Sequence, residues 1–177
     1  NQRGSRAIVD ALTPAELQRL PYLWEAWARA NQLPPPGDWR TWLIRAGRGF
    51  GKTRAGAEYV RSKVESGIAR RIALVARTAA DCRDVMVEGE SGIIAICPPW
   101  NKPTYEPSKR RVTWPNGAMA TLFSADKPDL LRGPQFDLAW ADELATWRRP
   151  EAWDNLMLGL RLGSDPRCVV TTTPKPL

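Results

Sequence analysis

The sequence predicts an α/β fold with a central, mostly parallel sheet flanked by helices. Residues 46–53 form a glycine-rich loop between an apolar run and a segment with helical character. A short, mainly apolar run follows at residues 71–76, and a second one at residues 136–141. Such runs are typical of strands buried on both faces, and strand, helix and strand in this order form a parallel crossover unit.

The N-terminal part of the chain predicts two short helical segments. Residues 13–16, Thr-Pro-Ala-Glu, match a capping box with proline at the first helical position, so a helix should run to about Leu20 and end at Pro21. Residues 22–30 form a second amphipathic segment. Its apolar face would carry Leu23, Trp24, Trp27 and Ala28. A stiff, proline-rich loop over residues 31–38 follows.

The central part of the chain predicts two strands joined by a helix. The first strand is expected at about residues 41–46, and the helix at residues 52–66 before the helix-terminating Gly67. The inward-facing residues of this helix would be Ala55, Val60 and Val64. The second strand occupies residues 71–76, and residues 78–81 would cap another helix.

The last third of the chain predicts a hairpin followed by strand, helix and strand. Two β-prone runs, residues 111–114 and 118–123, flank the turn Pro-Asn-Gly. A strand is then expected at residues 136–141, a helix at about residues 150–162 and a final strand at residues 167–173. The predicted fold is therefore one α/β domain with a β-hairpin insertion.

Composition restricts the possible functions. The 177 residues include 26 lysines and arginines and 19 acidic residues, and the net charge of +7 favours contact with a polyanion such as nucleic acid. The absence of histidine excludes histidine-based catalysis and histidine-ligated metals. Cys82, Cys97 and Cys168 lack paired spacing and are expected to be reduced cytosolic thiols. No spanning apolar run or secretory leader is found, so no membrane contact is expected.

The glycine-rich loop has the residue types of a phosphate-binding loop. Its residues are Ala46, Gly47, Arg48, Gly49, Phe50, Gly51, Lys52 and Thr53. Glycines let backbone N–H groups turn toward an anion, and the following helix adds the positive end of its dipole. Lys52 can reach the β- and γ-phosphates of a nucleoside triphosphate, and the Thr53 hydroxyl can coordinate Mg²⁺. Ala46 replaces the glycine of the strict pattern, and a plain glycine-rich turn is the alternative.

Two adjacent carboxylates, Asp142 and Glu143, end the apolar run at residues 136–141. Ligands of open α/β sheets bind at the carboxyl ends of the strands, so both acids should emerge beside the phosphate loop. Asp142 suits the Mg²⁺ shell, and Glu143 is placed to orient or deprotonate an attacking water. The alternative is a solvated helix start, which is the usual place of an Asp-Glu pair.

Two arginines stand out by their positions. Arg48 lies inside the phosphate loop, where its guanidinium could move between a γ-phosphate and an acidic partner, although it could equally point to solvent. Arg132 lies on a turn just before the acidic strand. It could supply positive charge to a neighbour's triphosphate, or it could be an ordinary surface arginine.

These motifs occur in the order seen in the large terminase subunit of tailed bacteriophages and related prophages, which the chain resembles from about residue 20 to its end. The resemblance is carried by residues 46–53, 131–133, 142–143 and 171–176, and by residues 32–39 before the loop. It implies a P-loop NTPase of the ASCE type, which carries its catalytic glutamate on an additional strand. It also implies ATP hydrolysis with Mg²⁺, powering translocation of viral double-stranded DNA into procapsids.

The resemblance also implies roles for individual residues. Gln32 would contact adenine, Arg48 would be a sensor within the loop, and Arg132 would be an arginine finger presented to the adjacent subunit. Thr171, Thr172 and Thr173 would form the motif that couples hydrolysis to movement. Their strand should lie between the strand before the phosphate loop and the strand that ends in Asp142. Strand propensity alone is the alternative explanation for three threonines.

The same resemblance implies partners and a domain arrangement. The partners would be identical subunits in a ring, the portal protein, the small terminase subunit and double-stranded DNA, in the host cytoplasm and transiently at the portal vertex of the procapsid. Residues 1–177 would form one ATPase core, in which residues 1–40 contribute a helical segment and the adenine-side loop. Family members continue into a covering subdomain and an RNase H-like nuclease domain. The nuclease domain is absent from this chain, so no nuclease activity is expected of it.

Two other functions share these residues. A helicase-type nucleic-acid translocase has the same loop, acid pair and threonine-containing motif, but it would unwind a duplex instead of filling capsids. A nucleotide-gated assembly module would bind ATP without hydrolysing it. The presence of Lys52, Asp142 and Glu143 together argues against the second alternative.

Overall fold

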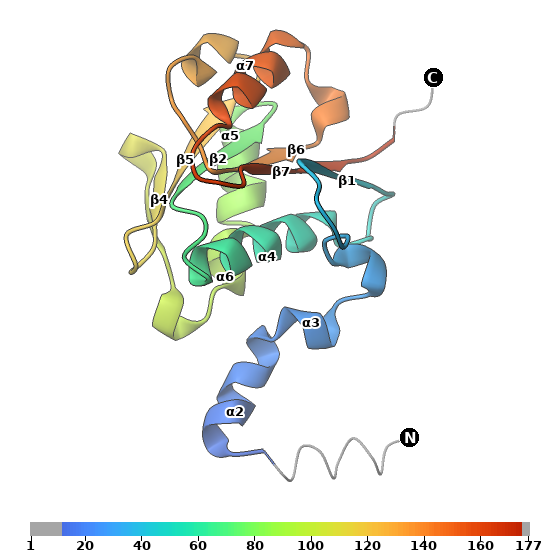
Figure 1. Cartoon of the computed structure of the whole chain (residues 1–177), viewed down its shortest axis with the longest axis vertical. Coiled ribbons are helices and arrows are strands. Elements are labelled where there is room, and N and C mark those ends of the chain that lie inside the picture. The colour runs from blue at the N-terminus through green and yellow to red at the C-terminus, as the bar shows by residue number, and fades with distance from the viewer. Residues whose placement is uncertain (1–11, 175–177) are drawn as a thin grey trace.

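The computed structural model describes residues 12–174 as a seven-stranded sheet with helices on both faces (Figure 1). The strands are β1 (Thr41–Arg45), β2 (Arg71–Ala76), β3 (Thr104–Glu106), β4 (Arg111–Thr113), β5 (Met119–Ser124), β6 (Leu138–Asp142) and β7 (Arg167–Thr172). The α-helices are α2 (Pro14–Arg19), α3 (Trp24–Trp27), α4 (Lys52–Glu65), α5 (Ala79–Asp81), α6 (Ile93–Ile96) and α7 (Glu151–Gly159). Shorter turns of helix are η1 (Leu20–Tyr22), η2 (Ala30–Gln32), η3 (Cys82–Val87), η4 (Pro99–Asn101), η5 (Pro107–Lys109), η6 (Pro128–Leu131) and η7 (Leu144–Thr146).

The strand order is β1-β7-β6-β2-β5-β4-β3. The first five strands of this order run parallel to one another, whereas β4 pairs antiparallel with β5, and β3 pairs antiparallel with β4. The strand at residues 167–173 was expected between the strand before the phosphate loop and the strand that ends in Asp142, and β7 lies there. The carboxyl ends of β1, β7 and β6 are therefore neighbours at one edge of the sheet.

Alternating side chains of the central strands build two hydrophobic cores, one on each face of the sheet. In β2, Ile72 and Leu74 belong to the core beneath α4 and α6, whereas Ala73 and Val75 belong to the core beneath α7. This period of two follows from the pleat, which directs successive side chains to opposite faces. The sequence prediction of strands buried on both faces is confirmed for β2 and β6.

Helix α4 follows the glycine-rich loop directly and packs on β6 and β7. Its contact with the sheet is close at Gly56, where an added Cβ would lie 2.4 Å from a carbon of the Trp140 ring. Ala55, Val60 and Val64 are buried, as the periodicity predicts. Gly67 adopts a φ of 75° just after the helix, in agreement with its predicted role as the C-terminal stop.

Several predicted elements differ in extent from the observed ones. The second N-terminal helix is only Trp24–Trp27, and its expected apolar face is open, because Trp27 is 61% exposed and Leu23 50% exposed. The capping box at residues 78–81 is present, but the helix changes to the π-helical turn η3 after Asp81. The helix expected to reach residue 162 ends at Gly159. Local patterns place these elements, but tertiary packing sets where they end.

The predicted hairpin forms, but it is part of the main sheet. Strands β4 and β5 pair antiparallel, and β5 also pairs in parallel with β2 along its whole length. A third strand, β3, which the sequence did not indicate, pairs with β4. Pairing of β5 with β2 places the hairpin at the far edge of the sheet from β1, where it does not approach the phosphate loop.

The N-terminal segment, residues 13–32, lies at one end of the molecule (Figure 1). The capping box of α2 is present as predicted, but α2, η1 and α3 contain no buried residue. All three cysteines are buried as free thiols. Within residues 12–174, no helix is long and apolar enough to cross a membrane.

Replacing Gly56 by alanine tests the close contact between α4 and the sheet. The added methyl group would collide with the buried Trp140 ring, and this strain exceeds the gain in helix propensity, so the free energy of unfolding should fall by about 1–2 kcal/mol. Urea unfolding measures the change. Gly47→Ala is the control, because its Cβ would meet nothing within 4 Å and its φ is not positive. Equal stability of both variants would show that the contact is not tight.

Candidate nucleotide site

The phosphate loop and its acidic and threonine partners meet at the carboxyl ends of β1, β6 and β7. The loop follows β1, Asp142 ends β6, and Thr171 lies opposite Asp142 in the register between β6 and β7. The structure thus brings the loop, the acid pair and the threonine motif together, although they are far apart in the sequence. Parallel pairing of the three strands is the cause.

Lys52 links the two ends of the loop to the acid pair. Its Nζ donates to the Gly47 carbonyl oxygen at 3.1 Å and lies 3.7 Å from Oε1 of Glu143. The side chain is nearly buried, with 8% of Lys52 exposed. Gly49 and Gly51 adopt φ values of 76° and 83°, which favour glycine and turn the backbone sharply before α4. The loop therefore has the shape of an anion-binding turn, with its lysine folded back over it.

Asp142 is buried and held by a hydroxyl group. Oγ1 of Thr171 donates to Oδ1 of Asp142 at 2.5 Å, and the same hydroxyl accepts from Nε1 of Trp140 at 2.8 Å. Burial raises the pKa of Asp142 to about 6, although the Thr171 hydrogen bond opposes this shift. The neighbouring strand thus orients the carboxylate, and burial favours its protonated form. A cation beside the carboxylate would lower the pKa again.

Glu143 has a strained backbone and is held by Thr173. Its φ of 47° and ψ of 47° lie in the left-handed region, which is uncommon for a residue with a side chain. The backbone N–H of Thr173 donates to Oε2 at 2.9 Å, and its hydroxyl donates to Oε1 at 2.8 Å. Because Lys52 also lies beside Oε1, one carboxylate joins the loop, the acid pair and the threonine motif.

Each of the three threonines contacts the chain around the acid pair. Thr171 holds Asp142 and Thr173 holds Glu143, while the Thr172 hydroxyl accepts from the backbone N–H of Ala145 at 3.1 Å. Strand propensity alone does not account for this, because a valine would fill a strand position equally well without these hydrogen bonds. Side-chain hydrogen bonds therefore join residues 171–173 to the segment that carries the acid pair.

A cleft of about 920 Å³ opens beside these groups. One wall is the phosphate loop with Lys52 and Thr53, and Glu143 and Thr173 also line the cleft. A second wall comes from the turn of η3 and the chain after it. Its residues are Asp84, Val85, Gly89, Glu90 and Ser91. Sequence reasoning missed this wall, and its one available signal was the two glycines at residues 89 and 92, which pack against backbone carbonyls.

The two arginines occupy different surroundings. Arg48 is exposed and lines the cleft, so it can reach a bound anion. The Arg132 side chain is 70% exposed, lies 3.7 Å from Asp129 and lines a separate groove with Leu158. The structure does not bring Arg132 to the cleft of its own chain.

Gln32 lies under the loop and does not line the cleft. It is 7% exposed, and its Nε2 donates to the Phe50 carbonyl oxygen at 2.8 Å. Arg29, which sequence reasoning missed, donates to the same carbonyl at 2.5 Å. The one sequence signal for Arg29 was its spacing of three residues from Gln32, which places both on one face of a helical turn.

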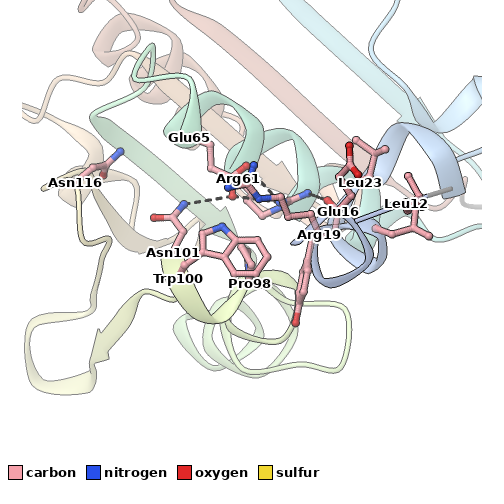
Figure 2. Close-up of a pocket in the computed structure, with 12 residues that line it drawn as sticks. Leu12, Glu16, Arg19, Leu23, Arg61, Glu65, Pro98, Trp100, Asn101 and Asn116 are labelled. Carbon is pink, nitrogen blue, oxygen red and sulfur yellow. Dashed lines mark hydrogen bonds and ion pairs between the residues drawn. The ribbon is translucent and has the colours of Figure 1, made fainter. Parts of the chain in front are cut away.

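A second cavity, of about 760 Å³, lies between the N-terminal segment and η4 (Figure 2). Figure 2 shows Arg61 and Glu65 at its centre and Trp100 at its side. Arg61 is already paired with Glu58, Glu65 and the Tyr22 carbonyl, at 2.6, 3.1 and 2.7 Å. None of the loop or acid-pair residues lines this cavity, so the cleft beside Lys52 is the candidate site.

The family model for the N-terminal part of the large terminase subunit, T4-like virus type, matches residues 43–177. The chain belongs to this terminase family. The match covers the phosphate loop, both acids and the threonine motif. No curated protein sequence matches the chain.

Solved terminase structures share the fold. The large terminase ATPase domain of Thermus phage P74-26 superimposes with a TM-score of 0.55 at 18% identity, over 78% of this chain and 61% of that one. The large terminase of a thermophilic bacteriophage in complex with ATP-gamma-S has a TM-score of 0.60 at 12% identity, over 88% and 36%. The bacteriophage Phi-29 packaging motor assembly has a TM-score of 0.53 at 16% identity, over 75% and 42%.

These likenesses confirm the predicted fold class. The open, mixed sheet of this terminase domain is a P-loop fold of the ASCE type, as the sequence predicts. The chain spans 61% of the Thermus phage domain and 36–42% of the other two chains. At these identities the likeness concerns the fold alone.

Replacing Thr171 by valine tests the hydroxyl that holds Asp142 in this terminase domain. The variant leaves the Asp142 carboxylate and the Trp140 indole N–H without their buried partner, so the free energy of unfolding should fall by about 2–3 kcal/mol. Thr171→Ser is the matched control, because it keeps the hydroxyl and should retain more of the stability. Denaturant unfolding measures the free energy of unfolding of both variants. Equal losses of stability in the two would assign the effect to packing alone.

Proposed function

We propose that this terminase domain hydrolyses ATP and that hydrolysis powers translocation of viral double-stranded DNA into procapsids. The proposal rests chiefly on Glu143, whose carboxylate contacts both the phosphate-loop lysine and the threonine motif. A carboxylate in this place can act on a water beside the terminal phosphate and transmit a change there to β7. Family membership adds the packaging role, because residues 43–177 match the family model for the N-terminal part of the large terminase subunit.

Similar solved structures support nucleotide binding and packaging. One is an ATPase domain, one holds ATP-gamma-S, and one is a viral genome packaging motor assembly. Each of these chains is longer than the part that this chain matches. The complete packaging activity is therefore proposed for a protein that contains this domain together with the rest of such a chain. The helicase-type alternative shares the site, and strand-separation and packaging assays of that protein separate the two functions.

The phosphate loop would hold the triphosphate through its backbone N–H groups and Lys52. The Lys52 ammonium, now 3.1 Å from the Gly47 carbonyl oxygen, lies where it can turn to the β- and γ-phosphates. Arg48, exposed at the cleft, would reach the γ-phosphate. Ala46 leaves the backbone of the loop intact, since backbone N–H groups, not side chains, make the cradle.

Mg²⁺ fits the donors at this site. Thr53 lines the cleft, and Asp142 is a buried carboxylate with a raised pKa, which an adjacent cation would lower again. Within residues 12–174, no cluster of three acidic or cysteine side chains could hold a metal alone, so the remaining ligands would be phosphate oxygens and waters. Bound there, Mg²⁺ supplies positive charge that stabilises the charge developing on the phosphates.

Glu143 would orient the attacking water and accept its proton. Thr173 and Lys52 fix the carboxylate from two sides, and positioning of this kind is the main contribution of a protein to phosphoryl transfer. Departure of the terminal phosphate would remove the group that lies beside both Lys52 and Glu143. Thr171, Thr172 and Thr173 would pass that change into β7, which is the proposed coupling step.

Arg132 would act on the site of an adjacent subunit. Its guanidinium is exposed and lies outside the cleft of its own chain, paired only with a highly exposed aspartate. An arginine supplied in trans can raise the rate of phosphoryl transfer by about 10³–10⁵. The proposed partners are accordingly identical subunits in a ring, the portal protein, the small terminase subunit and double-stranded DNA, at the procapsid portal vertex in the host cytoplasm. The chain would serve there as one ATPase core domain.

Two substitutions separate binding from chemistry. Lys52→Ala should weaken ATP binding, whereas Glu143→Gln should keep Mg·ATP bound but lose hydrolysis, because only the second removes the water-orienting carboxylate. Fluorescent-nucleotide titration and phosphate release are the measurements. The same two substitutions at exposed positions outside the cleft, Lys127→Ala and Glu151→Gln, are the controls and should leave binding and hydrolysis unchanged. Near wild-type turnover in both site variants would contradict the assignment, and ATP binding without phosphate release by assembled wild-type subunits would favour the non-hydrolysing module.

A mixing experiment tests the trans role of Arg132. Assemblies made only of Arg132→Ala or only of Glu143→Gln subunits should be inactive, but mixtures should recover part of the turnover, since some interfaces then pair an intact arginine with an intact glutamate. Arg70→Ala, at the amino end of β2, is the control and should be active alone. Mixtures that stay inactive, while wild-type subunits demonstrably exchange into them, would make Arg48 of the same subunit the better candidate.

A further inference from the structure

The Phe50 carbonyl oxygen receives two side-chain donors from the N-terminal segment. Nη2 of Arg29 lies 2.5 Å from it and Nε2 of Gln32 lies 2.8 Å from it. The two donors are themselves linked, because the backbone N–H of Arg29 donates to Oε1 of Gln32 at 3.0 Å. The Arg29 guanidinium also lies over the Phe50 ring, 5.1 Å from its centre. One peptide group of the phosphate loop is therefore held by Gln32, at the end of η2, and by Arg29, the N-cap residue of the same turn.

The Gln32 amide is occupied within the protein. It is 7% exposed, both its nitrogen and its oxygen are hydrogen-bonded to backbone groups, and it does not line the cleft. Its Nε2 lies 2.7 Å from the point where a Cβ of Gly51 would be, so the amide is packed directly against the loop backbone. In this position the Gln32 side chain contacts the loop backbone and does not reach the cleft in which a nucleotide base would lie.

The orientation of the Phe50 carbonyl determines that of the next N–H. The peptide bonds of the described residues are all trans, and in a planar trans peptide the N–H points opposite to the C=O. Because the Phe50 oxygen faces Gln32 and Arg29, the N–H of Gly51 faces away from them. Gly51 lines the cleft, so this N–H is one of the groups available to an anion there.

We propose that Arg29 and Gln32 are positioning residues that clamp the Phe50–Gly51 peptide and so preorganise the phosphate loop for the triphosphate. The inference rests on the proposed nucleotide function and revises the role expected for Gln32, because the clamp acts on phosphate binding and not on recognition of adenine. A loop that is ordered before binding loses less conformational freedom when the anion arrives.

The N-terminal segment is attached so that it can hold the loop. Arg61 of α4 donates to the Tyr22 carbonyl at 2.7 Å, and the Arg54 guanidinium lies 5.4 Å from the centre of the Trp24 ring. Helix α4 is the continuation of the loop. The loop is thus held on one side by its own helix and on the other by η2, which contacts on α4 keep in place.

Amide hydrogen exchange of the free protein tests the clamp without any nucleotide. Gln32→Leu removes both hydrogen bonds of the Gln32 amide while keeping a side chain of similar size. We expect hydrogen exchange of the amides of residues 49–52 to become at least tenfold faster, while exchange of the β2 and β6 amides stays unchanged. Asn31→Ala, the exposed neighbour in the same turn, should change neither. Arg29→Ala, at an exposed position where folding is not at risk, should accelerate the same loop amides by a smaller factor. Unchanged loop exchange in both clamp variants would overturn the proposal.

Ligand titration with Mg·ATP, Mg·GTP and Mg·tripolyphosphate separates the clamp from a base contact. Gln32→Leu should weaken binding of all three ligands by the same factor, about tenfold for loss of the hydrogen bond from Gln32 to the loop, with Asn31→Ala as the reference. Loss of ATP affinity alone, with tripolyphosphate unchanged, would overturn the clamp and favour the adenine contact. If exchange accelerates as expected but the wild-type chain binds none of the three ligands, the clamp stands and the proposed function fails.

Discussion

Parallel pairing of β7 between β1 and β6 is the constraint on which the site depends. The three strands end at the same edge of the sheet, so the phosphate loop, the acid pair and the three threonines emerge side by side. Side-chain hydrogen bonds then connect them, with Thr171 on Asp142 and Thr173 on Glu143. Without the β6–β7 pairing, each of these groups would be an isolated polar residue at the end of a strand.

Polar groups near the site are joined in one network that runs from α4 to β7. Lys52 at the start of α4 approaches Glu143, Glu143 is held by Thr173, and Thr172 holds the backbone that follows the acid pair. The left-handed backbone of Glu143 places its carboxylate toward both the loop and β7, and such strain is maintained only where the surroundings hold it. A network of this kind suits a site in which a change at the phosphate has to be transmitted.

The phosphate loop is held by contacts from its own lysine and from the N-terminal segment. Lys52 closes its two ends, while Arg29 and Gln32 hold its middle at the Phe50 carbonyl. The N-terminal segment that carries these two residues buries almost nothing itself, apart from Gln32. The segment contacts the loop through these two residues and contacts α4 through Tyr22 and Trp24.

Local sequence patterns were enough to predict most of the elements and the chemical groups of the site. Period-two and period-3.6 patterns, the capping boxes and the glycine-rich loop depend on neighbouring residues only, so β2, α4 and the acidic strand could be predicted. The family resemblance also placed β7 correctly. The fold places Gln32 against the loop backbone, brings Arg29 to the same carbonyl oxygen, adds the turn of η3 to the cleft lining and leaves Arg132 outside the cleft of its own chain. These facts depend on contacts between residues distant in the chain, which local periodicity does not encode.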